Sequence, residues 1–227
     1  MTEMKRVLIT GANGLIGRSL VTTYSKNGWD VIAHTRRADS SLPNNLVADL
    51  SAPGSGTSLI HNAGKLDCVI NNAANQEIID SSSIDASFIE KVFRINVGAP
   101  TEIMIAAKSI GVSTVLNISS VEATNPRAGH EIYGASKAAL ESLTKSLANS
   151  LAPMRIHGIR LGLIGDESLT QLWPEGVASW KSNVASKRYG TPEEVAELAL
   201  AMSTSIFAFA TGAIIDFDGG KSASPGW

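Results

Sequence analysis

Two residues of this sequence, Tyr133 and Lys137, are spaced so that they could transfer a proton together. They stand in Tyr133-Gly-Ala-Ser-Lys137, and a helix places positions i and i+4 on one face. A Lys ammonium beside a Tyr hydroxyl favours the phenolate and lowers its pKa from the usual value near ~10, which suits acid–base chemistry at neutral pH. By itself the pattern also describes an ordinary helix start with one exposed lysine.

A glycine-rich turn near the N-terminus predicts a phosphate-binding site. The turn follows an apolar run at 7–9 and opens a helical pattern at 15–27. Glycines at 11, 14 and 17 allow a tight turn, close approach of the backbone to a pyrophosphate, and close helix–strand packing. The N–H groups of the helix start favour negative charge. We therefore expect dinucleotide contacts from Thr10, Gly11, Asn13, Gly14, Leu15, Ile16 and Gly17.

The residues after the second apolar run predict which dinucleotide binds. Thr35, Arg36 and Arg37 stand where an NAD enzyme usually has an acidic residue for the ribose 2′-hydroxyl. Two guanidinium groups suit bidentate contacts with a phosphate, although a solvated basic loop is the alternative. We expect NADP (NADPH) in preference to NAD. Further contacts are expected after the third and fourth runs, from Asp49, Leu50, Asn72 and Ala73.

Short apolar runs alternate with helical segments along the chain. The runs predict about seven strands at 7–9, 31–33, 45–48, 69–70, 114–118, 155–160 and 213–215. Helices are expected at 15–27, 84–95, 101–110, 133–151 and 192–202. This alternation is typical of an α/β fold with a doubly wound parallel sheet and helices on both faces, in which ligands bind beyond the carboxyl ends of the strands. Without a repeat or linker, we expect one domain over 1–227.

The composition argues against several classes of function. The 19 Lys and Arg and 21 Asp and Glu are scattered, which argues against a nucleic-acid partner. The four histidines lack paired spacing, so no metal site is expected. A single cysteine, Cys68, suits a reducing compartment, and polar residues interrupt the most apolar stretch. We expect a cytoplasmic protein without a membrane partner.

With Asn96 and Ser120 added, the chain resembles the short-chain dehydrogenase/reductase family over nearly its whole length. Ser120 lies thirteen residues before Tyr133, which matches the family's catalytic Ser–Tyr spacing. Asn96 matches the family's fourth catalytic residue. The segments 188–196 and 211–220 resemble its penultimate helix start and its last strand and closing turn. The resemblance implies a Rossmann-type sheet and the catalytic set Asn96, Ser120, Tyr133 and Lys137.

The same resemblance implies an NADP(H)-dependent oxidoreductase that interconverts a carbonyl and an alcohol by hydride transfer. Tyr133 would act as general acid or base, and Ser120 would stabilise the reacting oxygen. Lys137 would lower the Tyr133 pKa and bind the nicotinamide ribose, so both residues also count as cofactor contacts. Asn96 would hold a water that links Lys137 to solvent. The backbone of Ile164 would contact the carboxamide.

Three positions depart from the family pattern. The glycine spacing is that of the family's extended branch, so Leu15 stands where the short branch has glycine. Ala74 and Leu161 replace a glycine and a proline that family members commonly carry. Because the sequence has no room for the large C-terminal substrate domain of the extended branch, the short single-domain branch is favoured.

The substrate is less well defined by the sequence. The segment at about 163–187 is expected to form a short lid, in which Trp173 and Trp180 would pack against the domain or a second subunit, with stacking on a substrate as the alternative. The polar loop 122–131 favours a polar, sugar-like small molecule, and a solvated loop is the alternative. An epimerase or dehydratase acting on a sugar derivative and a non-catalytic NADP(H)-sensing module remain alternative functions. Apolar helix faces permit a homodimer or homotetramer.

Overall fold

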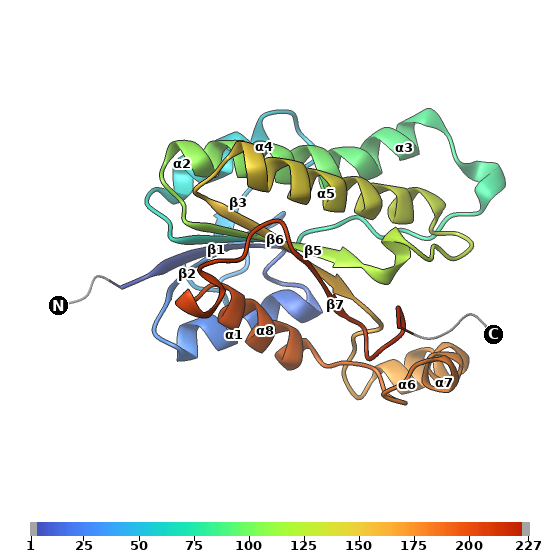
Figure 1. Cartoon of the computed structure of the whole chain (residues 1–227). Coiled ribbons are helices and arrows are strands. Elements are labelled where there is room, and N and C mark those ends of the chain that lie inside the picture. The colour runs from blue at the N-terminus through green and yellow to red at the C-terminus, as the bar shows by residue number, and fades with distance from the viewer. Residues whose placement is uncertain (1–3, 224–227) are drawn as a thin grey trace.

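A parallel sheet of seven strands carries the fold, in the order β3-β2-β1-β4-β5-β6-β7 (Figure 1). This computed structural model describes residues 4–223. The strands are β1 Arg6–Thr10, β2 Asp30–Thr35, β3 Leu46–Val47, β4 Cys68–Asn71, β5 Thr114–Ser120, β6 Arg155–Leu161 and β7 Ile214–Phe217. The strand order reverses beside β1, so that β4 starts the second half of the sheet. The prediction of a doubly wound, Rossmann-type parallel sheet is confirmed.

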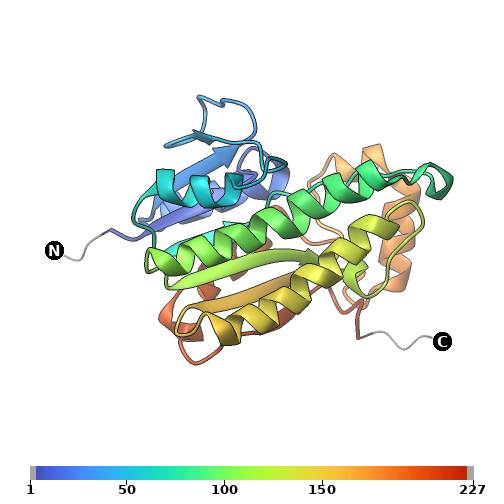
Figure 2. The same ribbon diagram turned by 90° about the horizontal axis from the view of Figure 1, so that it is seen from above.

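Helices cover both faces of this sheet. One face carries α1 (Leu15–Lys26) and α8 (Pro192–Met202). The other carries α2 (Ser55–Ala63), α4 (Ala99–Ser109) and α5 (Glu131–Ser150), which lie side by side in Figure 2. Helix α3 (Ala86–Phe93) runs into α4 through a π-helical turn at Arg94–Gly98. Two short helices, α6 (Leu169–Leu172) and α7 (Pro174–Asn183), lie beyond the sheet near the C-terminal residues.

Alternating side chains of the strands supply two hydrophobic cores. Val7 and Ile9 of β1 point into the core beneath α1 and α8, whereas Leu8 points into the core beneath α2 and α4. All three are fully buried. Burial of such a side chain contributes about 1.5–3 kcal/mol, so both helical layers are held against the sheet by the same short strands. This explains the near-continuous apolar runs in the sequence.

Some element boundaries differ from those expected. Helix α2 was not expected, because Gly56, Ser58 and Asn62 are weak helix formers. Gly56 instead serves packing, since a Cβ there would lie 2.7 Å from the backbone oxygen of Ala99. The helix expected at 84–95 starts two residues later, after Asp85, whose side chain caps it by accepting from the Phe88 N–H.

Cys68 is buried, with its Sγ 3.4 Å from the Ser203 hydroxyl. Burial raises the pKa of the thiol to about 12, so the thiolate is not formed near neutral pH. Within residues 4–223, no cluster of three or more His, Cys, Asp or Glu side chains could hold a metal ion. No helix in this range is long and apolar enough to cross a membrane.

Gly17 is the glycine on which the first helix turn most depends. A Cβ at this position would lie 2.2 Å from the backbone oxygen of Gly11 and 2.8 Å from backbone atoms of Ala12. Because backbone atoms cannot swing aside as a side chain does, Gly17→Ala is expected to lower the free energy of unfolding by about 3 kcal/mol. Urea denaturation measures this. Gly14→Ala is the matched control, with 3.4 Å to its nearest neighbour and an expected change within about 0.5 kcal/mol. Equal losses in both variants would contradict the packing argument.

Candidate active site

A cavity of about 1080 Å³ opens beyond the carboxyl ends of the central strands. Its two ends are formed by segments far apart in the sequence: the glycine turn and the β2 end on one side, and the ends of β5 and β6 with the start of α5 on the other. It brings together most of the site residues expected from the sequence. These are Gly11, Asn13, Gly14, Leu15, Ile16, Gly17, Arg36, Arg37, Asp49, Leu50, Asn72, Ala73, Ser120, Tyr133, Lys137 and Ile164.

Backbone groups dominate the glycine-turn end. Gly14 precedes α1 as its N-cap residue, and no described side chain caps its N–H groups. The first turn carries no acidic residue, so its N–H groups and partial positive charge suit a phosphate. Gly11 adopts a left-handed conformation with φ of 63°, which favours glycine. This end therefore fits the diphosphate of a dinucleotide.

Thr10 lies outside the cavity lining and holds the glycine turn to the end of β4. Its Oγ1 accepts from the N–H groups of Asn72 at 2.9 Å and Ala73 at 3.0 Å. In return, the Asn72 side chain donates to the carbonyl oxygens of Thr10 at 2.9 Å and Gly11 at 3.1 Å. Thr10 and Asn72 thus position the turn through a closed set of hydrogen bonds.

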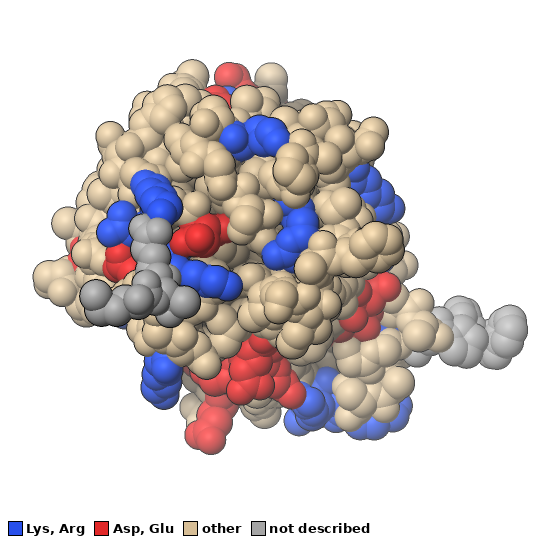
Figure 3. Space-filling model, turned by 60° about the vertical axis from the view of Figure 1, so that its left-hand side comes forward, with Lys and Arg blue, Asp and Glu red and all other residues tan. Residues whose placement is uncertain are grey.

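Arg36 and Arg37 are exposed at the mouth of the cavity. Thr35 lies beneath them, fully buried, and donates from Oγ1 to the Arg37 carbonyl at 2.6 Å. Its side chain therefore shapes the arginine loop from below. Hydrogen bonds from Ser51 and the charge of Arg36 lower the pKa of Asp49. This end of the cavity presents two cations beside one carboxylate. Figure 3 shows another side of the molecule, on which basic side chains are scattered and acidic side chains gather most densely toward the lower edge.

His34 is a site residue that the sequence reasoning missed. The Gly11 N–H donates to its Nδ1 at 3.4 Å, so Nε2 carries the proton and donates to the Ala48 carbonyl at 3.1 Å. The ring is 2 % exposed, and burial lowers its pKa. A neutral imidazole therefore joins the glycine turn to the segment after β3. Its place at the end of β2, two residues before Arg36, was the available signal.

The reacting end lies where β5 meets α5. Ser120 ends β5, and its Oγ accepts from the Glu122 N–H at 3.2 Å. Tyr133 and Lys137 lie one turn apart near the start of α5, with Lys137 Nζ 5.6 Å from the centre of the Tyr133 ring. Nζ also donates to the Ile118 carbonyl at 2.8 Å. The structure thus gathers the hydroxyl, the phenol and the ammonium on one wall.

Burial shifts the pKa values of Tyr133 and Lys137 on this wall. Desolvation raises the pKa of Tyr133 to about 12, although the Ser120 hydroxyl acts in the opposite direction. The net shift is therefore opposite to the one expected from Lys137 alone. Desolvation also lowers the pKa of Lys137 to about 8, while the charge of Glu141 raises it. In the protein without cofactor, Tyr133 is a protonated acid near neutral pH.

Asn96 is fully buried in the π-helical turn and does not line the cavity. Its Oδ1 accepts from the Asn75 N–H at 2.7 Å, and its Nδ2 donates to the Asn75 carbonyl at 2.8 Å and to Ser136 Oγ at 2.9 Å. Both N–H groups of the amide are thus engaged by protein atoms. The side chain ties the segment after β4 to α5, and its expected role in holding a water stays a prediction.

Charged and aromatic residues border the reacting end. Glu122 accepts from His130 Nδ1 at 2.9 Å and pairs with Arg127 at 3.1 Å. The His130 ring lies 5.2 Å from that of Tyr133. Arg127 lies 5.1 Å above the ring of Trp173. The polar loop therefore faces Tyr133 and the cavity rather than solvent alone.

The segment expected as a lid contains α6 and α7, and both of its tryptophans are packed. A Cβ on Gly176 would lie 1.9 Å from the Trp173 ring, so the ring rests directly on this glycine. Trp180 Nε1 donates to the Arg188 carbonyl at 3.1 Å, and its ring lies against Gly162. Ile164 pairs with Gly190 through an isolated bridge.

The family model described as Enoyl-(Acyl carrier protein) reductase matches residues 11–222. The chain belongs to the short-chain dehydrogenase/reductase family. It is an oxidoreductase of the NAD(P)-dependent dehydrogenase/reductase class, as expected from the resemblance.

Three similar proteins are distant in sequence and span nearly the whole chain. L-xylulose reductase from Caenorhabditis elegans is 28% identical over 96% of this chain and 96% of its own. The cyclic-di-GMP-binding biofilm dispersal mediator protein of Escherichia coli is 28% identical over 96% of this chain and 98% of its own. The crystal structure of BdcA in complex with NADPH superposes with a TM-score of 0.86 at 26% identity, covering 95% of this chain and 93% of that one.

Asn96→Ala is expected to destabilise the protein by about 3 kcal/mol, because two half-buried backbone groups of Asn75 and the buried Ser136 hydroxyl each lose a hydrogen bond. The free energy of unfolding from urea denaturation measures the loss. Asn13→Ala, a change of the same type at an exposed position, should stay within about 0.5 kcal/mol of wild type. A stable Asn96→Ala protein would show that the segment after β4 is held by other contacts.

Proposed function

We propose that this protein is an NADP(H)-dependent oxidoreductase that interconverts a carbonyl and an alcohol, with Tyr133 as the general acid or base. The observation that carries the proposal is the arrangement of one cavity. Ser120, Tyr133 and Lys137 share the wall at one end, while the glycine turn and two arginines form the other. In this proposal the chain is a single domain over 1–227, with a substrate lid at about 163–187.

Each residue of the reacting end has a role that follows from its position. A bound nicotinamide cofactor would supply or accept hydride. Tyr133 holds the proton that a reduced carbonyl oxygen requires, and its raised pKa keeps that proton in place until reaction. The Ser120 hydroxyl, at the end of β5, stabilises the oxygen as charge develops. Lys137 keeps a positive charge beside the phenol, which stabilises the negative charge that develops on Tyr133 as it gives up its proton. Asn96 acts by holding the segment after β4 against α5.

The cofactor end favours NADP over NAD in this proposal. Arg36 and Arg37 are the two exposed cations at that end of the cavity, and guanidinium groups bind phosphate in a bidentate manner. The BdcA structure with bound NADPH supports the same cofactor. No acidic side chain occupies the first position after β2, where an NAD enzyme would bind the ribose 2′-hydroxyl.

A small polar substrate, such as a sugar-like ketone or alcohol, fits the reacting end. Besides Glu122 and Arg127, the cavity is lined there by Gln76, Asn125 and His130. Such groups compensate the hydroxyls of a sugar and leave a fatty ketone without partners. The name of the L-xylulose reductase relative supports this class. A homodimer or homotetramer is the assembly we propose.

Tyr133→Phe is expected to lower kcat/KM for NADPH-dependent carbonyl reduction about 1,000-fold, because the proton donor is lost while the ring is kept. NADPH affinity should survive, since the glycine turn is untouched. The assay follows NADPH absorbance over a panel of sugar-derived and lipophilic carbonyl compounds. Tyr189→Phe, outside the cavity, is the matched control and should retain the wild-type rate.

Other outcomes of this experiment separate the competing functions. Turnover that leaves NADPH unconsumed would indicate an epimerase or dehydratase. Full biological activity of Tyr133→Phe would indicate an NADP(H)-sensing module. Preference for lipophilic ketones would contradict a polar substrate.

Arg36→Ala/Arg37→Ala is expected to weaken NADPH binding about 100-fold and to leave NADH binding unchanged, because charged hydrogen bonds to the 2′-phosphate are lost. Fluorescence titration with each nucleotide measures this. Arg6→Ala, at the opposite end of β1, is the control and should alter neither affinity. An equal loss for both nucleotides would contradict a specific 2′-phosphate site.

A further inference from the structure

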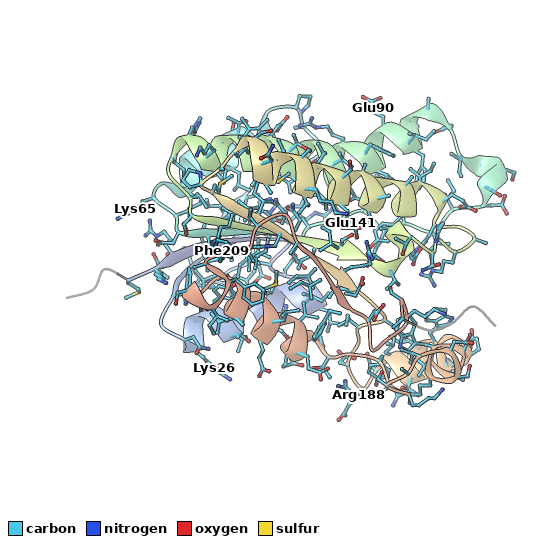
Figure 4. The ribbon with its side chains drawn as sticks, viewed as in Figure 1. Lys26, Lys65, Glu90, Glu141, Arg188 and Phe209 are labelled. Carbon is cyan, nitrogen blue, oxygen red and sulfur yellow. The ribbon has the colours of Figure 1, made fainter. Side chains whose placement is uncertain are left out.

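A row of alternating charges runs from the reacting end of the cavity to the far edge of the sheet. It consists of Lys137 and Glu141 on α5, Arg160 on β6 and Asp216 on β7. Lys137 is 3 % and Glu141 7 % exposed, whereas the Asp216 side chain is 45 % exposed. In Figure 4, Glu141 lies between α5 and the sheet. The row therefore begins in the protein interior and ends at solvent.

The register of the sheet fixes this row. Ser119 of β5 is paired with Arg160 of β6, and Arg160 is paired with Asp216 of β7. Residues paired across parallel strands project to the same face, so all three side chains lie beneath α5. Glu141 is one helical turn after Lys137, on the same side of α5. The arrangement thus follows from backbone pairing rather than from flexible surface side chains.

Glu141 is held by several donors. The Ser119 hydroxyl donates to its Oε1 at 2.7 Å, Arg160 Nε to the same oxygen at 2.9 Å, and Arg160 Nη2 to Oε2 at 2.5 Å. Arg160 Nη1 donates to Asp216 at 2.8 Å. Two of these three donors belong to a guanidinium, so the carboxylate is bound by charge-assisted hydrogen bonds. It is therefore a fixed negative charge beside the reacting end.

Lys137 needs such a charge. Its ammonium is buried and donates to the neutral Ile118 carbonyl, and an isolated buried ammonium loses its proton readily. Burial lowers the pKa of Lys137 while Glu141 opposes the change. The other charged or titratable groups facing this region are Tyr133 on α5, Arg160 on β6 and, from the loop over the cavity, Glu122, Arg127 and His130.

We propose that Glu141 is a positioning residue that keeps Lys137 protonated, and that Arg160 limits its effect by neutralising part of its charge. Neither residue touches the cavity; both act on the Tyr133–Lys137 pair through space. The inference rests on the proposed function, in which that pair transfers the proton. Glu141, one helical turn after Lys137 on α5, then sets the pH range over which the enzyme works.

The proposal is tested by the directions in which substitutions of Glu141 and Arg160 shift the pH profile. Removal of a negative charge favours proton loss from any nearby group, and removal of a positive charge opposes it, whichever member of the coupled pair titrates. The measurement is kcat for carbonyl reduction against pH at saturating NADPH. We expect the descending alkaline limb to move down by about one pH unit in Glu141→Gln and upward in Arg160→Gln. The double variant Glu141→Gln/Arg160→Gln should lie between them.

Asp216→Asn is the control for a distant, half-exposed charge of the same row. Solvent screens it, so its shift should stay below about 0.3 pH unit. Shifts of the two single variants in the same direction, or no shift in folded proteins, would overturn the proposal, because a merely structural role cannot produce opposite signs. If Glu141→Gln does not fold, the pH profiles of Arg160→Gln and of the double variant are compared instead. These two proteins differ only at position 141, so the difference between them reports the effect of the Glu141 carboxylate.

A failure of the proposed function is recognised separately. If the wild-type protein reduces none of the carbonyl compounds in the panel, that function is rejected. The pair is then measured without substrate, by the tyrosinate absorbance of each protein minus that of its Tyr133→Phe counterpart during alkaline titration. The same opposite displacements of the Tyr133 transition are expected in Glu141→Gln and Arg160→Gln. Their absence would overturn the role of Glu141 itself.

Discussion

The hydrogen bond from the buried Lys137 ammonium to the Ile118 carbonyl is the contact on which the reacting end depends. It fixes the position of α5 along β5, and this places Tyr133 beside Ser120. A buried charge is tolerated only where polar groups surround it. The fold supplies these groups from both sides: a backbone carbonyl from the strand, and a carboxylate from the next turn of the helix. Site and fold are stabilised by the same packing of one helix on one strand.

The nucleotide end is organised differently, by backbone rather than by charge. His34 and Asn72 bond backbone groups of the glycine turn, and Thr10 bonds the backbone N–H groups that follow β4. None of these side chains needs to touch a phosphate in order to matter, since each fixes the direction of an N–H or C=O group. The two arginines lie outside this framework and are exposed. In the proposed function, the rigid part of the cavity would bind what all dinucleotides share, and the exposed arginines would distinguish among them.

Much of this architecture follows from the sequence. Apolar runs such as Val7–Ile9 locate buried strands, because a parallel sheet is covered on both faces, and glycine positions locate the turn. The offset of Ser120 from Tyr133 was interpretable through the family resemblance. His34, Glu141 and Arg160 were not identified, because their roles depend on partners brought close by strand pairing. Helix α2 carries weak helix formers, and the π-helical turn around Asn96 has no local signal. The upward pKa shift of Tyr133 depends on burial, which spacing alone does not reveal.

The contacts of Trp173 with Gly176 and Arg127 connect the segment at about 163–187, which we propose as a lid, to the reacting end. Arg127 lowers the pKa of Tyr133 and Glu122 raises it, and the two are paired with each other. Because the guanidinium also rests on the Trp173 ring, any displacement of the lid alters the balance of charge that the phenol experiences. The position of the lid segment and the pKa of Tyr133 then change together. In the proposed function, a movement that carried Trp173 away from Arg127 would therefore change the acidity of Tyr133.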